Sequence, residues 1–218
     1  MSSRLYAIYG SSGCGRGIMP LAREQLRLQN IDSNRLVFVD DNPGPSKIND
    51  QRVLSYREFL ATDASERYVV IAIAGSRIRE KLAVQCATDA VQAWSVRAAN
   101  TVIMDDVILG AGALLSPFVT LTSNIEIGRH FHANIYCYVA HDCRIGDFVT
   151  FAPSVKCNGN VQIEDYAYIG TGAVIRQGKP GQPLVIGKAA VVGMGAVVTK
   201  DVAPGVTVVG NPARILMK

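Results

Sequence analysis

The sequence predicts a small α/β domain followed by a parallel β-helix of hexapeptide repeats. The β-helix is predicted by an apolar residue at every sixth position, which recurs without a slip from Ile103 to Ile175. Helices repeat at about 3.6 residues and strands at about 2, whereas short strands stacked in coils explain a period of six. The α/β domain is predicted by apolar segments that alternate with helical segments before residue 98.

The hexad series and its neighbours describe the interior of the predicted β-helix. The sixth-position residues are Ile103, Leu109, Leu115, Leu121, Ile127, Ala133, Val139, Ile145, Phe151, Cys157, Ile163, Ile169 and Ile175. A second series, two places earlier each time, is mostly small or β-branched and can share a narrow core. Residues 177–183 are rich in Gly and Pro and are expected to form a loop, after which the hexads resume at Ile186.

The segment before residue 98 alternates between strands and helices, as is typical of a parallel α/β sheet. Strands are expected over 5–9, 35–39, 68–74 and 91–96, and helices over 16–29, 55–60 and 76–87. The strand 68–74 is apolar throughout, as is typical of a strand buried on both faces. We therefore expect a Rossmann-like domain over 1–98 and the β-helix over 99–218.

Composition excludes several classes of protein. The net charge is +4 without a long basic run, so nucleic-acid binding is not expected, although a modest positive field attracts phosphate-bearing ligands. No apolar run is long enough to span a membrane, and the N-terminal segment has no secretory pattern. The five cysteines are odd in number and lack a Cys-x-x-Cys pair, which disfavours a disulfide framework or a zinc ribbon. Cytoplasmic location is expected.

A Gly-rich segment between the first strand and the first helix is a candidate phosphate site. Free N–H groups and the helix dipole favour anions at a helix start, and glycine lets a phosphate approach. The segment comprises Gly10, Ser11, Ser12, Gly13, Cys14 and Gly15. Asp40 and Asp41 end the second strand, where a ribose or base can be held, and Gly75 and Ser76 follow the third strand. A tight turn beside a solvated acidic loop is the alternative. The glycine spacing differs from the dinucleotide fingerprint, so a complete NAD site is not expected.

His141 is the candidate general base. His141 is two residues after the inward hexad position Val139, so its side chain is expected to point outward beside a corner. The adjacent Asp142 can orient the imidazole. An exposed surface histidine is the alternative. A metal site built from His130, His132 and His141 is disfavoured, because their spacing matches no ligand pattern and no carboxylate cluster accompanies them.

Together these motifs resemble the PglD/NeuD-like bacterial sugar acetyltransferases over nearly the whole chain. The matching segments are 10–15, 38–41, 72–75, the hexads, 140–147, 156–161 and 210–213. The hexads alone are shared by a large superfamily, whereas the N-terminal Gly-rich segment and the His141–Asp142 dipeptide are much narrower signals. Two positions depart from the resemblance, because Cys14 and Thr150 stand where similar sequences often have histidine.

The resemblance implies a homotrimer of left-handed β-helices with acetyl-CoA in the groove between neighbours. It implies that the N-terminal domain holds a nucleotide-linked, usually UDP-linked, amino sugar, whose amine is acetylated by direct transfer in surface-glycan biosynthesis. In this scheme His141 is the general base, Asp142 supports it, and the backbone N–H of Gly159 faces the thioester carbonyl. Positions that match contacts to the pantetheine arm are Thr171, Gly172 and Ala189.

Three other functions stay open at this point. An O-acetyltransferase of the sialic-acid type would use the same base. A non-catalytic nucleotide-sugar-binding trimer would have no need of the His141–Asp142 pair. A metal-dependent hexapeptide enzyme such as a γ-type carbonic anhydrase is disfavoured by the histidine spacing.

Overall fold

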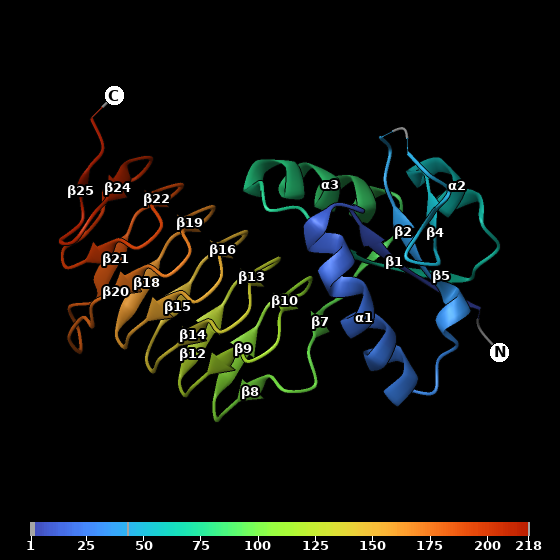
Figure 1. Ribbon diagram of the computed structural model, residues 1–218. Helices are drawn as coiled ribbons and strands as arrows, with labels where there is room; N and C mark the ends of the chain where they lie inside the picture. The colour runs from blue at the N-terminus through green and yellow to red at the C-terminus, as the bar shows by residue number, and fades with distance from the viewer. Residues whose placement is uncertain (1–2, 43, 218) are drawn as a thin grey trace. The chain divides into compact units, whose positions relative to one another are not determined.

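The computed structural model describes residues 3–42 and 44–217. The chain divides into two compact units, Met1–Ala99 and Asn100–Lys218 (Figure 1). The first unit mixes helices with a sheet, and the second is a stack of short strands.

The first unit contains a mostly parallel sheet in the order β3-β4-β2-β1-β5-β6. Its strands are β1 (Arg4–Tyr9), β2 (Leu36–Val39), β3 (Lys47–Ile48), β4 (Gln51–Leu54), β5 (Glu66–Ile71) and β6 (Gln92–Ala93). The helices are α1 (Gly13–Leu28), the short 3-10 helix η1 (Ser33–Arg35), α2 (Tyr56–Ala61) and α3 (Ser76–Thr88). All pairings are parallel except the β3–β4 hairpin. Because β1 lies between β2 and β5, the segments that follow these three strands meet at one edge of the sheet.

Local interactions explain where these helices and strands begin, and why some of the predicted bounds differ from the observed ones. Ser55 caps α2 through a capping box with Glu58, as its position before the helix suggested. Helix α1 begins at Gly13 rather than at residue 16, so half of the Gly-rich segment is the first helical turn. The β3–β4 hairpin was not predicted, because its strands are short and largely polar. The strand expected over 91–96 is two short pieces, β6 and β7 (Val96–Arg97).

The second unit is a parallel β-helix with three sheets, which confirms the interpretation of the hexads (Figure 1). Sheet I contains β10 (Leu114–Leu115), β13 (His132–Ala133), β16 (Thr150–Phe151), β19 (Tyr168–Ile169), β22 (Val191–Val192), β24 (Thr207–Val209) and the antiparallel β25 (Arg214–Ile215). Sheet II contains β8 (Val102–Ile103), β11 (Thr120–Leu121), β14 (Tyr138–Val139), β17 (Lys156–Cys157), β20 (Val174–Ile175) and β23 (Val197–Val198). Sheet III contains β9 (Val107–Leu109), β12 (Ile125–Ile127), β15 (Arg144–Ile145), β18 (Val161–Ile163) and β21 (Leu184–Ile186).

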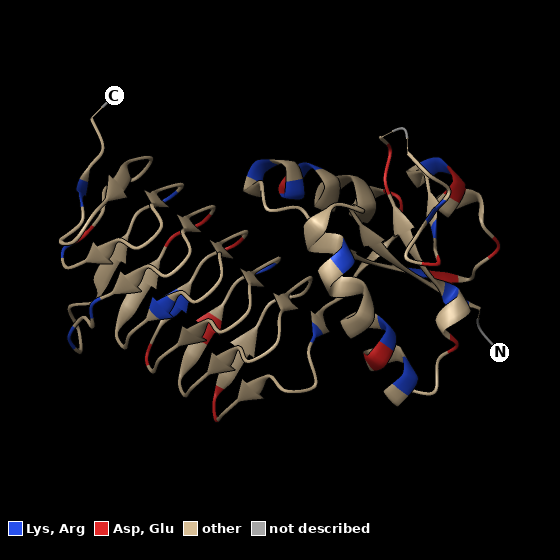
Figure 2. Cartoon of the chain, in the orientation of Figure 1, with Lys and Arg blue, Asp and Glu red and all other residues tan. Residues whose placement is uncertain are grey.

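From β8 to β20 each coil returns to the same place after 18 residues, so hexad residues stack in columns. Leu115, Ala133, Phe151 and Ile169 are in register on successive strands of sheet I, and all four are buried. The hexads and the second series form one continuous core. Figure 2 shows basic and acidic residues interspersed along the coils.

Three corners join the sheets, and each is a column of residue pairs from successive coils. The His141 corner (105–106, 123–124, 141–142, 159–160) joins sheet II to sheet III. The Phe148 corner (129–130, 147–148, 165–166, 188–189) joins sheet III to sheet I, and the Tyr136 corner (117–118, 135–136, 153–154, 171–172) joins sheet I to sheet II. The second residue of each pair has a positive φ and donates its N–H to the first residue of the preceding coil's pair.

Candidate active site

The candidate base and its acidic neighbour form a hydrogen-bonded pair on the His141 corner. Nδ1 of His141 lies 2.6 Å from Oδ2 of Asp142, and the two side chains are 49% and 47% exposed. Because a carboxylate only accepts hydrogen bonds, the pair places the ring proton on Nδ1 and leaves Nε2 with a lone pair. This is the tautomer that a general base requires.

The coil ladder fixes this pair from both sides. Asp142 has a φ of 58° and donates its N–H to Ser123 O at 3.1 Å, while His141 O accepts from the N–H of Asn160 at 3.0 Å. The amide of Asn124, one coil earlier, donates to Oδ1 of Asp142 at 3.3 Å. Both oxygens of the carboxylate are therefore engaged, and its orientation toward His141 is set by its neighbours.

These contacts also keep Asp142 ionised. The hydrogen bond from His141 lowers the pKa of Asp142, partial burial opposes it, and the hydrogen bond from Asn124 adds to the lowering. The carboxylate is thus available as an acceptor at neutral pH, which is the state in which it orients an imidazole.

Gly159 is the surface on which the His141 ring lies. It occupies the next coil of the same corner, and a Cβ added to it would stand 2.5 Å from Cε1 and 2.6 Å from Nε2 of His141. Only glycine therefore fits beneath this ring orientation. Among the residues that the structure describes, no hydrogen bond of the Gly159 N–H is found, whereas its carbonyl accepts from Gly178 at 3.0 Å. A free N–H beside a free imidazole nitrogen is suited to an oxyanion.

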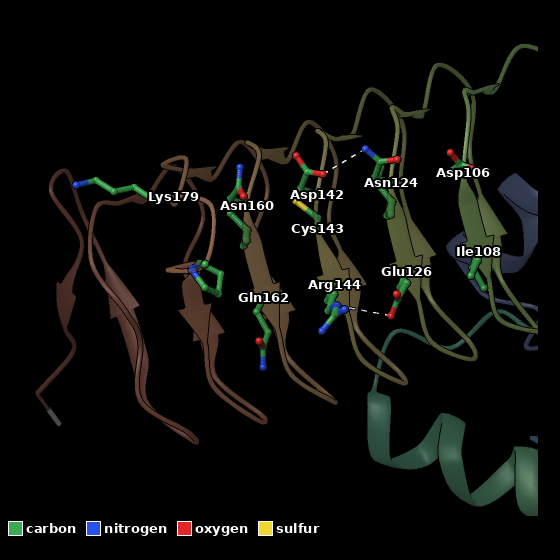
Figure 3. Close-up of a pocket in the computed structure, with 14 residues that line it drawn as sticks. Asp106, Ile108, Asn124, Glu126, Asp142, Cys143, Arg144, Asn160, Gln162 and Lys179 are labelled. Carbon is green, nitrogen blue, oxygen red and sulfur yellow. Dashed lines mark hydrogen bonds and ion pairs between the residues drawn. The ribbon is translucent and has the colours of Figure 1, made fainter.

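A groove of about 490 Å³ begins at the His141 corner and extends over sheet III (Figure 3). Asp106, Asn124, Asp142 and Asn160 line its corner side, in four successive coils. Its floor carries the outward side chains of sheet III, with an Arg144–Glu126 ion pair at 3.6 Å; the other floor residues are Ile108 and Gln162. The loop over 177–183 closes one end with Lys179.

The three positions matched to pantetheine contacts lie on other corners. Thr171 and Gly172 belong to the Tyr136 corner, and Ala189 belongs to the Phe148 corner. Within one chain the β-helix core separates these corners from His141. The structure therefore brings together His141, Asp142 and Gly159, and it does not bring the other three to them.

In the first unit, Asp40 connects the Gly-rich segment to the end of β2. Its Oδ2 accepts from the N–H and hydroxyl of Ser11 at 3.0 and 2.5 Å, and its Oδ1 accepts from the N–H and side-chain amide of Asn42 at 3.1 and 2.9 Å. Burial raises the pKa of Asp40, but the bonds from Ser11 and Asn42 outweigh it and lower the pKa below its ordinary value. Asp40 is ionised and serves first to shape the loop.

Asp41 has a similar structural role. Its carboxylate accepts from the Tyr9 hydroxyl at 2.5 Å and from the N–H of Tyr56 at 2.8 Å. It therefore joins the end of β1 to the start of α2, at the same edge of the sheet as Asp40.

The Gly-rich segment packs closely on itself at this edge. Gly10 has a φ of 103°, and a Cβ on Gly15 would stand 1.9 Å from Gly10 O, so the first turn of α1 lies directly against the end of β1. Ser12 is the N-cap of α1 but makes no side-chain cap bond, and no acidic residue occupies the first turn. Gly13 faces open space, and Cys14 is half-buried.

The third strand contributes a second helix start to the edge. Gly75 is the N-cap of α3 and makes no side-chain cap bond, and Ser76 is the first residue of this helix. The structure thus gathers the predicted acceptor-binding residues of all three strand ends, since β1, β2 and β5 are neighbours.

Residues 3–42 and 44–217 contain no cluster of three or more His, Cys, Asp or Glu side chains placed to hold a metal ion. Within the same ranges, no helix combines the length and apolar character needed to cross a bilayer.

Sequence reasoning missed two side chains near these sites. Asn124 was overlooked because it is remote in sequence from His141. Once the 18-residue coil length is known, its position 18 residues before Asp142 marks it as a neighbour of that carboxylate. Arg79, a buried guanidinium on α3, gave no signal, because nothing in a helical pattern marks an arginine as buried.

Relatives whose activity is named match nearly the whole chain. No protein-family model matches the chain. The GDP-perosamine N-acetyltransferase of Escherichia coli O157:H7 is 50% identical over 210 residues, which cover 96% of this chain and 95% of the relative. The chain belongs to the hexapeptide-repeat bacterial sugar acetyltransferases of the PglD/NeuD-like type. The resemblance inferred from the motifs is confirmed, and the protein is an acyltransferase.

Two solved structures support the assignment of this chain to the sugar acetyltransferase family. WeeI from Acinetobacter baumannii AYE is 56% identical, with a TM-score of 0.95 over 98% of this chain and 100% of WeeI. The acetyltransferase domain of PglB from Neisseria gonorrhoeae FA1090, solved in complex with acetyl coenzyme A, is 25% identical, with a TM-score of 0.86 over 99% of this chain and 100% of that domain.

Replacing Gly159 with alanine tests the seat of the His141 ring. Gly159→Ala keeps the backbone N–H but adds a Cβ that displaces the imidazole, and we expect kcat to fall about 10²-fold, as misplacing a reacting group by about 1 Å does. The KM for acetyl-CoA should change little. Gly17→Ala on α1, where a Cβ meets nothing within 4 Å, is the matched control and should leave kcat unchanged. Steady-state kinetics that find Gly159→Ala fully active would show that the ring position is not needed.

Proposed function

We propose that this protein transfers the acetyl group of acetyl-CoA to the amine of a nucleotide-linked amino-deoxy sugar in surface-glycan biosynthesis. The observation that carries the proposal is the His141–Asp142 pair, with the His141 ring packed against Gly159, whose N–H makes no hydrogen bond among the residues that the structure describes. The name of the E. coli relative supports an N-acetyl product, and the PglB complex supports acetyl-CoA as co-substrate.

The chemistry needs no covalent enzyme intermediate. The acceptor amine attacks the thioester carbon, so a C–N bond forms while the C–S bond breaks. His141 Nε2 takes the proton that the nitrogen loses and passes it to the departing coenzyme thiolate, which leaves as the thiol. The N–H of Gly159 stabilises the oxyanion, a contribution often worth about 3 kcal/mol.

The first unit is proposed to be a Rossmann-like nucleotide-sugar domain over 1–98. Its edge offers two helix starts without side-chain caps, which suit a diphosphate, beside the polar loop shaped by Asp40 and Asp41. The residues we assign to acceptor binding are Gly10, Ser11, Ser12, Gly13, Cys14, Gly15, Asp40, Asp41, Gly75 and Ser76. The relative's name favours GDP over the UDP linkage that the family resemblance implied.

The sugar O-acetyltransferase is the second candidate, because a hydroxyl could use the same base. The half-exposed His141 is open to either nucleophile, and the N-acetyltransferase name of the half-identical relative favours the amine. A non-catalytic nucleotide-sugar-binding trimer has no use for an oriented imidazole above a free N–H.

The positions assigned to the coenzyme lead us to propose a homotrimer. Thr171, Gly172 and Ala189 lie on corners other than that of His141, so one chain cannot present all of them to one ligand. Between two copies, the His141 corner of one β-helix can face another corner of its neighbour, and acetyl-CoA would lie in that groove. We place the enzyme in the cytoplasm, where acetyl-CoA is made.

A panel of acceptors tests the proposed activity. Coenzyme A release should be fast with GDP-perosamine, slower with UDP-linked amino sugars, and absent with sugars that carry only hydroxyl groups, because a neutral amine is the better nucleophile. Mass spectrometry of the product should find one added acetyl group on nitrogen. Transfer only to hydroxyl acceptors would support the O-acetyltransferase instead.

Mixed assemblies test the shared site. His141→Ala and Thr171→Trp should each be nearly inactive alone, the second because a bulky ring blocks the coenzyme. When the two are co-expressed, activity should return, because some interfaces combine an intact His141 with an intact Thr171. Light scattering should give a mass of three 23.4 kDa chains. A monomer, or mixtures that stay inactive, would contradict the proposal.

Removal of the base should affect the chemical step. His141→Ala should lower kcat by roughly 10²–10⁴, the usual span for general-base loss, with little change in coenzyme affinity. Asp142→Asn should cost less, since it only weakens the orientation of the ring. Steady-state kinetics and calorimetry with coenzyme A make the measurement. His130 and His132 are unsuitable controls, because both are buried and their loss tests folding. If His141→Ala retains most of its activity, the acceptor amine arrives already deprotonated.

A further inference from the structure

Arg79 is a fully buried charge in a unit that otherwise keeps its charges at the surface. Its exposed fraction is 0%, although arginine is almost never buried completely, because removing a charge from water is unfavourable. Its Nη1 donates to Ile73 O at 2.7 Å and to Ala74 O at 3.1 Å. Burial lowers the pKa of Arg79 to about 10, so the group remains a cation at neutral pH.

The two carbonyls that Arg79 holds lie in the turn between β5 and α3. This turn leads directly to Gly75 and Ser76, and it follows the strand that pairs with β1 in the register Tyr9↔Ile71. The turn and the Gly-rich segment therefore leave the same edge of the sheet from adjacent strands.

Arg79 also acts on the Gly-rich segment itself. The thiol of Cys14, in the first turn of α1, has a pKa raised by burial, and the nearby Arg79 charge opposes that rise. The guanidinium thus lies near the first turn of α1 and is bonded to the turn before α3. Arg79 therefore relates two of the segments to which we assign the nucleotide sugar.

We propose that Arg79 is a positioning residue for the acceptor site. It holds the β5–α3 turn beside the Gly-rich segment and supplies a fixed positive charge at the edge where the diphosphate of the nucleotide sugar binds. This inference rests on the proposed function. A diphosphate carries negative charge in a poorly solvated place, so a buried cation at that edge strengthens its binding without touching it.

The competing explanation is that Arg79 only satisfies backbone carbonyls. Arg67 provides the comparison, because it does that elsewhere in the unit. Its guanidinium donates to Leu60 O at 2.8 Å and to Thr62 O at 2.6 Å. Arg67 lies near the start of β5, whereas Arg79 lies beyond its end, so loss of Arg67 should cost stability without affecting the acceptor site.

The experiment compares Arg79→Met, Arg79→Lys and Arg67→Met in the full chain. Calorimetry measures the Kd for GDP, kinetics measure kcat and the KM values for GDP-perosamine and acetyl-CoA, and thermal unfolding monitors folding. For Arg79→Met we expect the Kd for GDP and the KM for the sugar nucleotide to rise roughly 10- to 100-fold, the range for losing hydrogen bonds to a charged group. The KM for acetyl-CoA and kcat should be unchanged. Arg79→Lys should recover part of the affinity, because it keeps the charge but not the planar fork.

Arg67→Met should lower the unfolding temperature and leave the Kd for GDP at the wild-type value. The inference is overturned if folded Arg79→Met binds GDP as wild type does, or if Arg67→Met weakens GDP binding equally. If Arg79→Met does not fold, Arg79→Lys decides: unchanged GDP affinity overturns the inference, and weakened affinity at wild-type acetyl-CoA KM supports it. Failure of the proposed function is distinguishable, because the wild-type enzyme would then neither bind GDP nor acetylate GDP-perosamine.

Discussion

The hydrogen-bond ladder between successive coils decides which residues become neighbours in the β-helix. Corner residues with a positive φ donate to the coil before them, so residues 18 apart stack before the 177–183 loop whatever their side chains are. The arrangement that we propose to be catalytic follows from this constraint. Asn124, Asp142 and the Gly159 seat of His141 come from three consecutive coils of one corner, and none could be adjusted without moving the ladder.

The sequence was sufficient for the core and insufficient for the corners. A six-residue apolar period determines which side chains point inward, because burial acts on each hexad alike, and this prediction is confirmed from Leu115 to Ile175. The fit of the His141 ring on Gly159 depends on a close approach that no periodicity reports. The same limit applies to Asn124, whose partner becomes visible only when three hexads are counted as one coil.

In the first unit, the sequence predicted most of the elements but not the hydrogen bonds that shape the loops between them. Most strands and helices followed from apolar segments, but the β3–β4 hairpin and the start of α1 did not. The start of α1 was missed because glycine at residues 13 and 15 resembles a loop, whereas both are helical and Gly15 packs closely on Gly10. The acidic pair was identified from the sequence, but its role as a set of hydrogen-bond acceptors within the protein was not. The carboxylates of Asp40 and Asp41 accept hydrogen bonds from N–H and hydroxyl groups of the unit itself. Long-range bonds of this kind leave no trace in local composition.

The loop over 177–183 shows where this architecture tolerates change. It lengthens one coil at the His141 corner, beyond Gly159, and closes on itself through the Lys179–Gln182 pair while the sheets on either side keep their register. An insertion between His141 and Gly159 would instead separate the imidazole from its seat. The length and chemistry of this loop can therefore change, and with them what the groove accepts, without moving the His141 ring from its place on Gly159.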